Sequence, residues 1–233
     1  MHRKNTEPYV EDIITPYHKV KIGVNTEIIC KKYTVLMHKI DQLRDINTPS
    51  SVFRIIVEEV TTIMACHATR NIDLEKFEME TPICKMVGHR IAGKKMVIAP
   101  ILRAGLGMEP AVKRLFPQAR TGHIGFYRDE ITLDPVEYFW IMPDRVEERE
   151  IFVLDPMLAT GGTADLAITK LKEVGCKSIH FLCILAAPQG VDRIQVKHPD
   201  VHLHVGCMDF GLDKDGYIVP GLGDAGDRIF GTK

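Results

Sequence analysis

The sequence predicts an α/β domain whose sheet is mostly parallel. Three short, almost wholly apolar segments, at residues 96–102, 151–154 and 178–187, have the composition of strands buried on both faces. Segments with helical spacing of apolar residues lie between them, so strand and helix alternate along the chain. The 233 residues are enough for one domain with a sizeable core.

In the first half of the chain, a helix is predicted from Thr48, a suitable N-cap, with Pro49 at the first helical position. The strand at 96–102 leads directly into Arg103 and a glycine-rich turn, and a helix is expected to run from there to about residue 115. Two segments rich in β-forming residues then predict a projecting hairpin at about 122–142.

The second half repeats the strand–helix pattern. It predicts a strand at 151–154, a loop at 155–163, a helix at 164–174, a strand at 178–187, a helix at 190–196 and a strand at 201–205. Ligands of such sheets bind at the carboxyl ends of the strands, which favours the loops after residues 102 and 154. Residues 1–33 are expected to form an N-terminal arm ahead of a single domain at 34–233.

Charge and composition exclude several classes of protein. Thirty basic residues against 31 acidic ones give a net charge of −1, which argues against a chain that mainly coats nucleic acid. No apolar segment approaches the roughly 20 residues of a membrane span, and no secretory signal is visible. Six cysteines without a C-x-x-C pair favour buried free thiols in a reducing compartment. We therefore expect a cytoplasmic protein without membrane or nucleic-acid partners.

The loop at 155–163 has the composition of a phosphate cradle. Gly161 and Gly162 let the backbone approach a ligand, and the following helix N-terminus adds partial positive charge. Thr160 and Thr163 supply hydroxyl donors, while Asp155 can accept hydrogen bonds from sugar hydroxyls or hold a cation. The loop lacks the Gly-Lys-Ser/Thr of a Walker A motif. A strand-to-helix turn with no ligand stays open as the alternative.

Four hydrophobic residues, then Asp155 and a loop ending in Thr-Gly-Gly-Thr, resemble the loop of type I phosphoribosyltransferases that binds phosphoribosyl diphosphate (PRPP). Within this superfamily, the chain most resembles the uracil phosphoribosyltransferases, and the resemblance runs from about residue 34 to the end. Four further segments carry it: 100–108, 127–130, 216–228 and 230–233. The resemblance implies the type I phosphoribosyltransferase fold, with a uracil-recognition segment at about 206–233. It also implies transfer of the phosphoribosyl group from PRPP to uracil, giving UMP and diphosphate.

The resemblance also assigns site residues. It implies catalytic roles for Asp224, Arg128 and Asp155. For PRPP it implies Arg103, Arg128, Asp155, Pro156, Met157, Leu158, Ala159, Thr160, Gly161, Gly162, Thr163 and Asp224. For uracil it implies Tyr217, Ile218, Gly223, Asp224 and Ala225, chiefly through main-chain groups. Mg²⁺ is expected to arrive with PRPP rather than in an all-protein site.

Two loop positions depart from the pattern of many purine phosphoribosyltransferases. Pro156 stands at the second of two adjacent acidic positions, and Ala159 stands at a later one. Both departures fit the uracil branch and remove a candidate general base from the loop. Two other hypotheses stay open: a non-enzymatic nucleotide sensor that binds RNA, which the near-neutral charge disfavours, and a purine-specific transferase.

Further residues have weaker assignments. Lys39 and Arg44 lie where some relatives hold an activating GTP, although a solvated helix face is the favoured interpretation. His202 and His204 would share one face of a strand, and a structural role is favoured over a metal site. The resemblance implies a homodimer or a higher homo-oligomer, built partly on the hairpin at 122–142.

Overall fold

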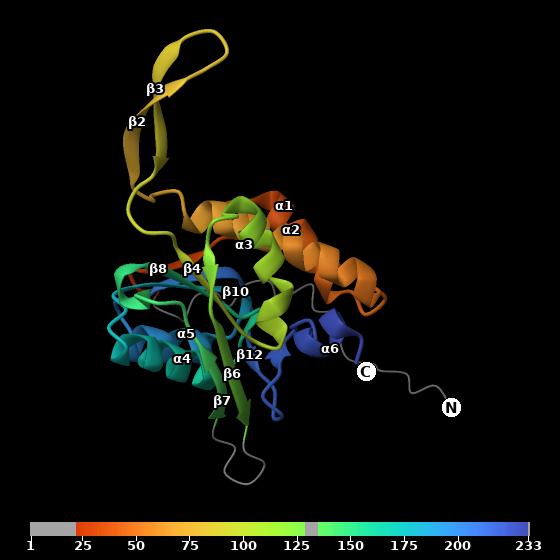
Figure 1. Ribbon diagram of the computed structural model, residues 1–233. Helices are drawn as coiled ribbons and strands as arrows, with labels where there is room; N and C mark the ends of the chain where they lie inside the picture. The colour runs from red at the N-terminus through yellow and green to blue at the C-terminus, as the bar shows by residue number, and fades with distance from the viewer. Residues whose placement is uncertain (1–21, 129–134, 233) are drawn as a thin grey trace.

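A seven-strand path forms the centre of the computed structural model, which describes residues 22–128 and 135–232 (Figure 1). Its order is β1-β11-β10-β8-β4-β6-β7, and each neighbouring pair is parallel except β6–β7. The strands are β1 (Thr26–Ile28), β4 (Val97–Leu102), β6 (His123–Arg128), β7 (Pro135–Ile141), β8 (Glu150–Leu154), β10 (Ser178–Ala186) and β11 (His202–Met208). The predicted mostly parallel α/β sheet is confirmed.

Helices cover both faces of this sheet (Figure 1). One face packs against α1 (Thr34–Arg44), α2 (Ser50–Ala68), α3 (Glu109–Leu115) and α6 (Ala225–Phe230), and the other against α4 (Gly162–Glu173) and α5 (Pro188–Lys197). Ile98 and Phe152 belong to the first core, whereas their chain neighbours Val97 and Val153 belong to the second. This alternation favours apolar residues at nearly every position of a central strand, and only the first residues of β8 and β10 include polar side chains.

Short elements complete the chain. They are β5 (Arg120–Thr121), β9 (Met157–Leu158), β12 (Gly211–Leu212), β13 (Ile218–Val219) and the 3-10 helices η2 (Ala104–Gly107) and η3 (Val146–Glu148). Within the described residues, none of the helices combines the length and the apolar character needed to cross a bilayer. Part of the predicted N-terminal arm, β1, pairs with β11 at the edge of the sheet. Residues 1–21 of that arm lie outside the described residues.

The predicted start of α2 is shifted by one residue. Pro49 occupies the N-cap position, with no side-chain capping hydrogen bond. The Thr48 hydroxyl instead donates to the Gln42 carbonyl at 2.6 Å, near the end of α1. Thr48 therefore serves the preceding helix, because the last carbonyls of a helix lack partners within it.

The hairpin predicted at 122–142 is confirmed as β6–β7, although its tip, residues 129–134, lies outside the described residues. A second hairpin, β2 (Leu74–Glu80) paired with β3 (Lys85–Ile91), has no counterpart in the sequence analysis. It extends away from the body of the molecule, and Gly88 is its one buried residue (Figure 1). A hairpin that lies outside the core carries no buried apolar run, which is the signal that found the other strands.

None of the six cysteines, all of which lie within the described residues, forms a disulfide bond. Cys30, Cys176 and Cys183 are buried, as expected. Cys66 and Cys84 are exposed, on α2 and beside the tip of the β2–β3 hairpin, which corrects the expectation for these two positions.

We predict that Leu182→Ala destabilises the fold strongly. Leu182 is fully buried in β10, at the middle of the sheet, and its truncation should lower the free energy of unfolding by about 2–5 kcal/mol. Val196→Ala, at a side chain 80% exposed on α5, is the matched control and should change that free energy by less than about 0.5 kcal/mol. Urea denaturation measures both variants, and equal effects would contradict the assigned core.

Candidate active site

Two adjacent strands bring the predicted binding loops together. β4 and β8 are parallel neighbours, with Pro100 opposite Leu154. Arg103 follows β4 directly and Asp155 follows β8 directly, so both residues begin loops at the carboxyl edge of the sheet. This is the edge at which sheets of this kind bind ligands.

The predicted phosphate loop lies between β8 and α4. Its middle, β9, pairs with the end of β10, and α4 begins at Gly162, two residues earlier than predicted. Gly161 has a φ of 78°, a left-handed conformation that side-chain-bearing residues rarely adopt. No hydrogen bond among the described residues engages the main-chain amides of Thr160 or Gly161. These amides lie at a helix N-terminus, where an anionic group is favoured.

Asp155 is the titratable group of this loop. Burial raises the pKa of its carboxyl from 3.8 to about 7, although the Met157 amide, 3.4 Å from Oδ1, opposes the shift. Its carboxyl is therefore near its midpoint of ionisation at neutral pH. A hydrogen-bonding or cationic ligand beside Asp155 would favour its charged form.

A partly buried ion cluster fixes the helix behind the loop. Asp165, in the first turn of α4, accepts from Arg193 Nε at 2.9 Å, from Lys197 Nζ at 2.7 Å and from His198 Nε2 at 3.0 Å. All three donors belong to α5 or directly follow it. Sequence reasoning missed this cluster, which ties α4 to α5 and so holds the position of the loop.

The arginine loop contacts the C-terminal segment. Arg103 is 59% exposed, with its Nη2 3.6 Å from Asp227 Oδ1 and its guanidinium carbon 5.9 Å from the centre of the Phe230 ring. Both partners lie on α6. Arg128 is the last residue of β6, beside the hairpin tip. The exposed guanidinium of Arg103 at the carboxyl edge suits recognition of diphosphate oxygens.

The predicted uracil segment forms a small hairpin followed by a helix. β12 pairs with β13, and the chain then passes through residues 220–224 into α6. Ile218 and Ala225 are buried, whereas Tyr217 is half exposed. Asp224 is exposed and caps α6, since its Oδ1 accepts from the Asp227 amide at 2.9 Å. Asp224 therefore has a structural role in addition to the predicted catalytic one.

The two residues considered for GTP have partners within the chain. Lys39 Nζ lies 2.8 Å from Glu59 Oε2. The side chain of Arg44 is only 20% exposed, and its guanidinium is paired with Asp209. The interpretation of a solvated helix face is therefore wrong for Arg44. Binding of GTP here stays a prediction.

The histidines lie at the opposite, amino-terminal edge. His202 and His204 share one face of β11, as predicted, and both rings stack with His180. His180 joins His204 to Glu150 by hydrogen bonds of 3.1 Å each, and burial lowers the pKa of His204 to about 3. These residues line a cavity of about 620 Å³. That cavity contains none of the predicted substrate residues.

Potential metal ligands are dispersed. Across residues 22–128 and 135–232, no group of three or more His, Cys, Asp or Glu side chains is arranged to hold a metal ion. Asp155 is the one carboxyl group of the phosphate loop. A divalent cation at this edge would therefore take most of its oxygen ligands from a substrate.

Fold and site together define a type I phosphoribosyltransferase: a parallel sheet with helices on both faces, and a strand–glycine loop–helix unit beside an arginine loop. Comparison with known proteins narrows this class. Residues 30–232 match the family model described as "Uracil phosphoribosyltransferase". Uracil phosphoribosyltransferase of Clostridium perfringens is 53% identical over 201 residues, which are 86% of this chain and 96% of that protein.

Two further comparisons agree. Uracil phosphoribosyltransferase of Finegoldia magna is 54% identical over 86% of this chain and 96% of its own length. The solved structure of the AQ2163 protein from Aquifex aeolicus is similar with a TM-score of 0.81 and 33% identity, covering 85% of this chain and 95% of that one. The chain belongs to the uracil phosphoribosyltransferase family.

The raised pKa of Asp155 predicts a pH dependence of stability. The folded protein keeps this proton to about pH 7 and the unfolded chain only to about pH 4, so the stabilisation from Asp155 is lost as the pH rises between these values. The free energy of unfolding of the wild type, relative to Asp155→Asn, should fall by up to about 1.4 kcal/mol per pH unit.

Urea denaturation of both proteins across this pH range measures the effect. Asp200→Asn is the control: the hydrogen bond from Lys172 lowers the pKa of Asp200, so its difference from wild type should stay nearly constant over this range. Its stabilisation is present above the ordinary pKa of an aspartate and is lost as the pH falls. A constant difference between the wild type and Asp155→Asn would show that the Asp155 carboxyl titrates normally.

Proposed function

We propose that this chain transfers the 5-phosphoribosyl group of PRPP to uracil, giving UMP and diphosphate. One observation carries the proposal: the phosphate loop, the arginine loop and the C-terminal segment meet at the carboxyl edge of one sheet. Membership in the uracil phosphoribosyltransferase family supports the identity of both substrates.

Each end of PRPP has a suitable partner in this proposal. The 5′-phosphate binds the loop at 160–163, where two unengaged amides and the N-terminus of α4 favour an anion. Arg103 and Arg128 bind diphosphate oxygens, and Asp155 with Asp224 holds the ribose hydroxyls. The remaining loop positions, 156–159, shape the pocket through their backbone.

Uracil is recognised mainly by the backbone. It offers two carbonyl acceptors and two N–H donors, which main-chain groups at Ile218, Gly223 and Ala225 can match, with Tyr217 at the rim of the site. Ala225 is buried and begins α6, and Ile218 is buried in β13, so both positions are held by the fold. A rigid edge of this kind discriminates against bases with a different donor pattern.

The chain's contribution to the reaction is positioning and electrostatic stabilisation. Bond cleavage at the anomeric carbon leaves negative charge on diphosphate, next to Arg103, and positive charge on the ribose, next to Asp155. Asp155 must be ionised to stabilise that ribose, and ligand contacts would lower its raised pKa. Mg²⁺ bound to PRPP would supply additional neutralisation of the diphosphate.

Two finer points belong to the same proposal. We propose a homo-oligomer, and the exposed apolar side chains of Leu74, Met79, Met86 and Val87 favour the β2–β3 hairpin as a subunit contact. Activation by GTP would require a site other than the guanidinium of Arg44, because Asp209 occupies it.

Uracil should be the one base that releases diphosphate. A release assay with PRPP and Mg²⁺ should give diphosphate with uracil and none above background with cytosine, hypoxanthine, guanine or adenine. Release with a purine base would move the chain to another substrate class. Binding of PRPP without release on any base would instead support the nucleotide-sensor hypothesis.

Two substitutions of Asp224 distinguish its proposed catalytic role from its role as the N-cap of α6. Asp224→Asn keeps a good N-cap residue and should lower kcat by about 100-fold or more, with an unfolding free energy within about 0.5 kcal/mol of wild type. Asp224→Ala loses the cap as well and should be less stable by about 1 kcal/mol. Steady-state kinetics and urea denaturation measure the two effects. Wild-type turnover in Asp224→Asn would remove Asp224 from the chemistry.

A further inference from the structure

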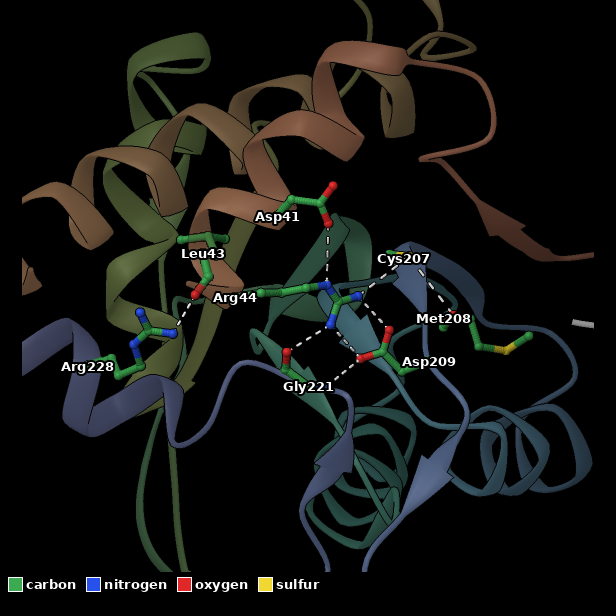
Figure 2. Close-up of polar contacts among 8 residues, drawn as sticks. All are labelled: Asp41, Leu43, Arg44, Cys207, Met208, Asp209, Gly221 and Arg228. Carbon is green, nitrogen blue, oxygen red and sulfur yellow. Dashed lines mark hydrogen bonds and ion pairs between the residues drawn. The ribbon is translucent and has the colours of Figure 1, made fainter. Parts of the chain in front are cut away.

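A buried ion pair joins the N-terminal helix to the C-terminal segment. Arg44, the last residue of α1, donates from Nη2 to Asp209 Oδ1 at 2.6 Å and from Nη1 to Asp209 Oδ2 at 2.8 Å (Figure 2). Asp209 directly follows β11, so its carboxylate lies at the carboxyl edge of the sheet. This is a bidentate arginine–carboxylate pair, the geometry that fixes both partners most firmly.

The pair also holds the main chain at Gly221. Arg44 Nη1 donates to the Gly221 carbonyl at 2.8 Å, and the Gly221 amide donates to Asp209 Oδ2 at 2.8 Å (Figure 2). Both polar groups of one peptide residue are thus bound by the same ion pair. Gly221 has a φ of 65°, and a Cβ there would lie 2.0 Å from the Ile218 carbonyl oxygen, so its path admits no side chain.

A second arginine, Arg228, binds the main chain of Leu222, the residue after Gly221. Arg228 of α6 donates to the Leu222 carbonyl at 2.8 Å and to the Asp45 carbonyl at 2.6 Å, and its guanidinium lies 4.3 Å from the centre of the Phe53 ring. It also donates to the Leu43 carbonyl (Figure 2). Consecutive carbonyls, at 221 and 222, are therefore each tied to the end of α1.

Burial makes the Arg44–Asp209 pair sensitive to substitution. The side chain of Asp209 is 3% exposed and that of Arg44 is 20% exposed. Burial alone would lower the pKa of Arg44, but hydrogen bonds and charge from Asp209 raise that pKa above its ordinary value, so the Arg44 guanidinium stays charged. Removing one charge leaves the other buried without its partner.

We infer that Arg44 and Asp209 are positioning residues for the pyrimidine base, which they orient by fixing the backbone at Gly221. The inference rests on the proposed function, in which Gly223 and Ala225 present main-chain groups to uracil. Gly221 is two residues before Gly223, which is at most about 7 Å along the chain. A shift of the backbone at Gly221 therefore displaces the main-chain groups proposed to contact the base, whereas the phosphate loop follows a different strand, β8.

Asp209→Asn tests the inference. The amide keeps the size of the side chain but has one acceptor oxygen and two N–H donors. Arg44 therefore loses at least one of its two hydrogen bonds to residue 209, and the Gly221 amide also loses its acceptor when the nitrogen takes the place of Oδ2. Asp41→Asn is the matched control, because Asp41 also faces Arg44, at 3.7 Å from Nε, but is 73% exposed and has no contact with Gly221. The substitutions are chemically identical.

The first measurement compares KM for uracil with KM for PRPP. In Asp209→Asn, KM for uracil should rise about 10- to 100-fold, while KM for PRPP changes less than about threefold. Asp41→Asn should leave both values within about twofold of wild type. The double variant Arg44→Lys with Asp209→Asn should be no worse than the worse single variant, because the two residues act as one unit.

The second readout does not depend on activity. Amide hydrogen exchange in residues 218–223 should accelerate about tenfold or more in Asp209→Asn, with residues 150–163 unchanged. An equal rise of KM for both substrates, or wild-type uracil KM with wild-type exchange, would overturn the inference. Failure of the wild type to form UMP would overturn the proposed function instead, while exchange would still report whether the ion pair holds the loop.

Discussion

The burial of the central strands on both faces is the constraint on which the site depends. Strands β4, β8 and β10 give alternate side chains to two cores, so they have no face on which a polar group could meet a ligand. Polar side chains therefore appear at the ends of the strands. Because the strands are parallel, Arg103, Asp155 and Asp209 all gather at one edge.

The two halves of that edge are held in different ways. On the phosphate side, α4 is tied to α5 through Asp165, and the loop itself carries no buried ion pair among the described residues. On the side proposed to bind the base, the loop at 221–222 is bound by Arg44 and Arg228, which fix it to α1. In the proposed function this difference matches the two substrates, because amides and exposed arginines suit a phosphate anion and a held backbone suits recognition of a base edge.

The sequence predicts those parts of the fold and site that depend on residues close together in the chain. The strands at 96–102 and 151–154 are apolar throughout because both faces are covered, and the phosphate loop is visible in its glycines and threonines. The β2–β3 hairpin was missed because it lies outside the core. The Arg44–Asp209 pair was missed for another reason: its partners are 165 residues apart, and only the fold brings them together. The residues of the candidate site can thus be predicted from the sequence, but the long-range ion pairs that hold them in place cannot.

A crystal structure of the chain with UMP would test both parts of the proposed site, because UMP carries both the phosphate and the base. We expect the phosphate at the amides of residues 160–163 and the pyrimidine edge against the main chain at 218 and 223–225. We also expect an unbroken Arg44–Asp209 pair next to the segment that holds the base. UMP bound at the opposite edge, in the cavity beside His180 and His202, would show that the proposed site is wrong.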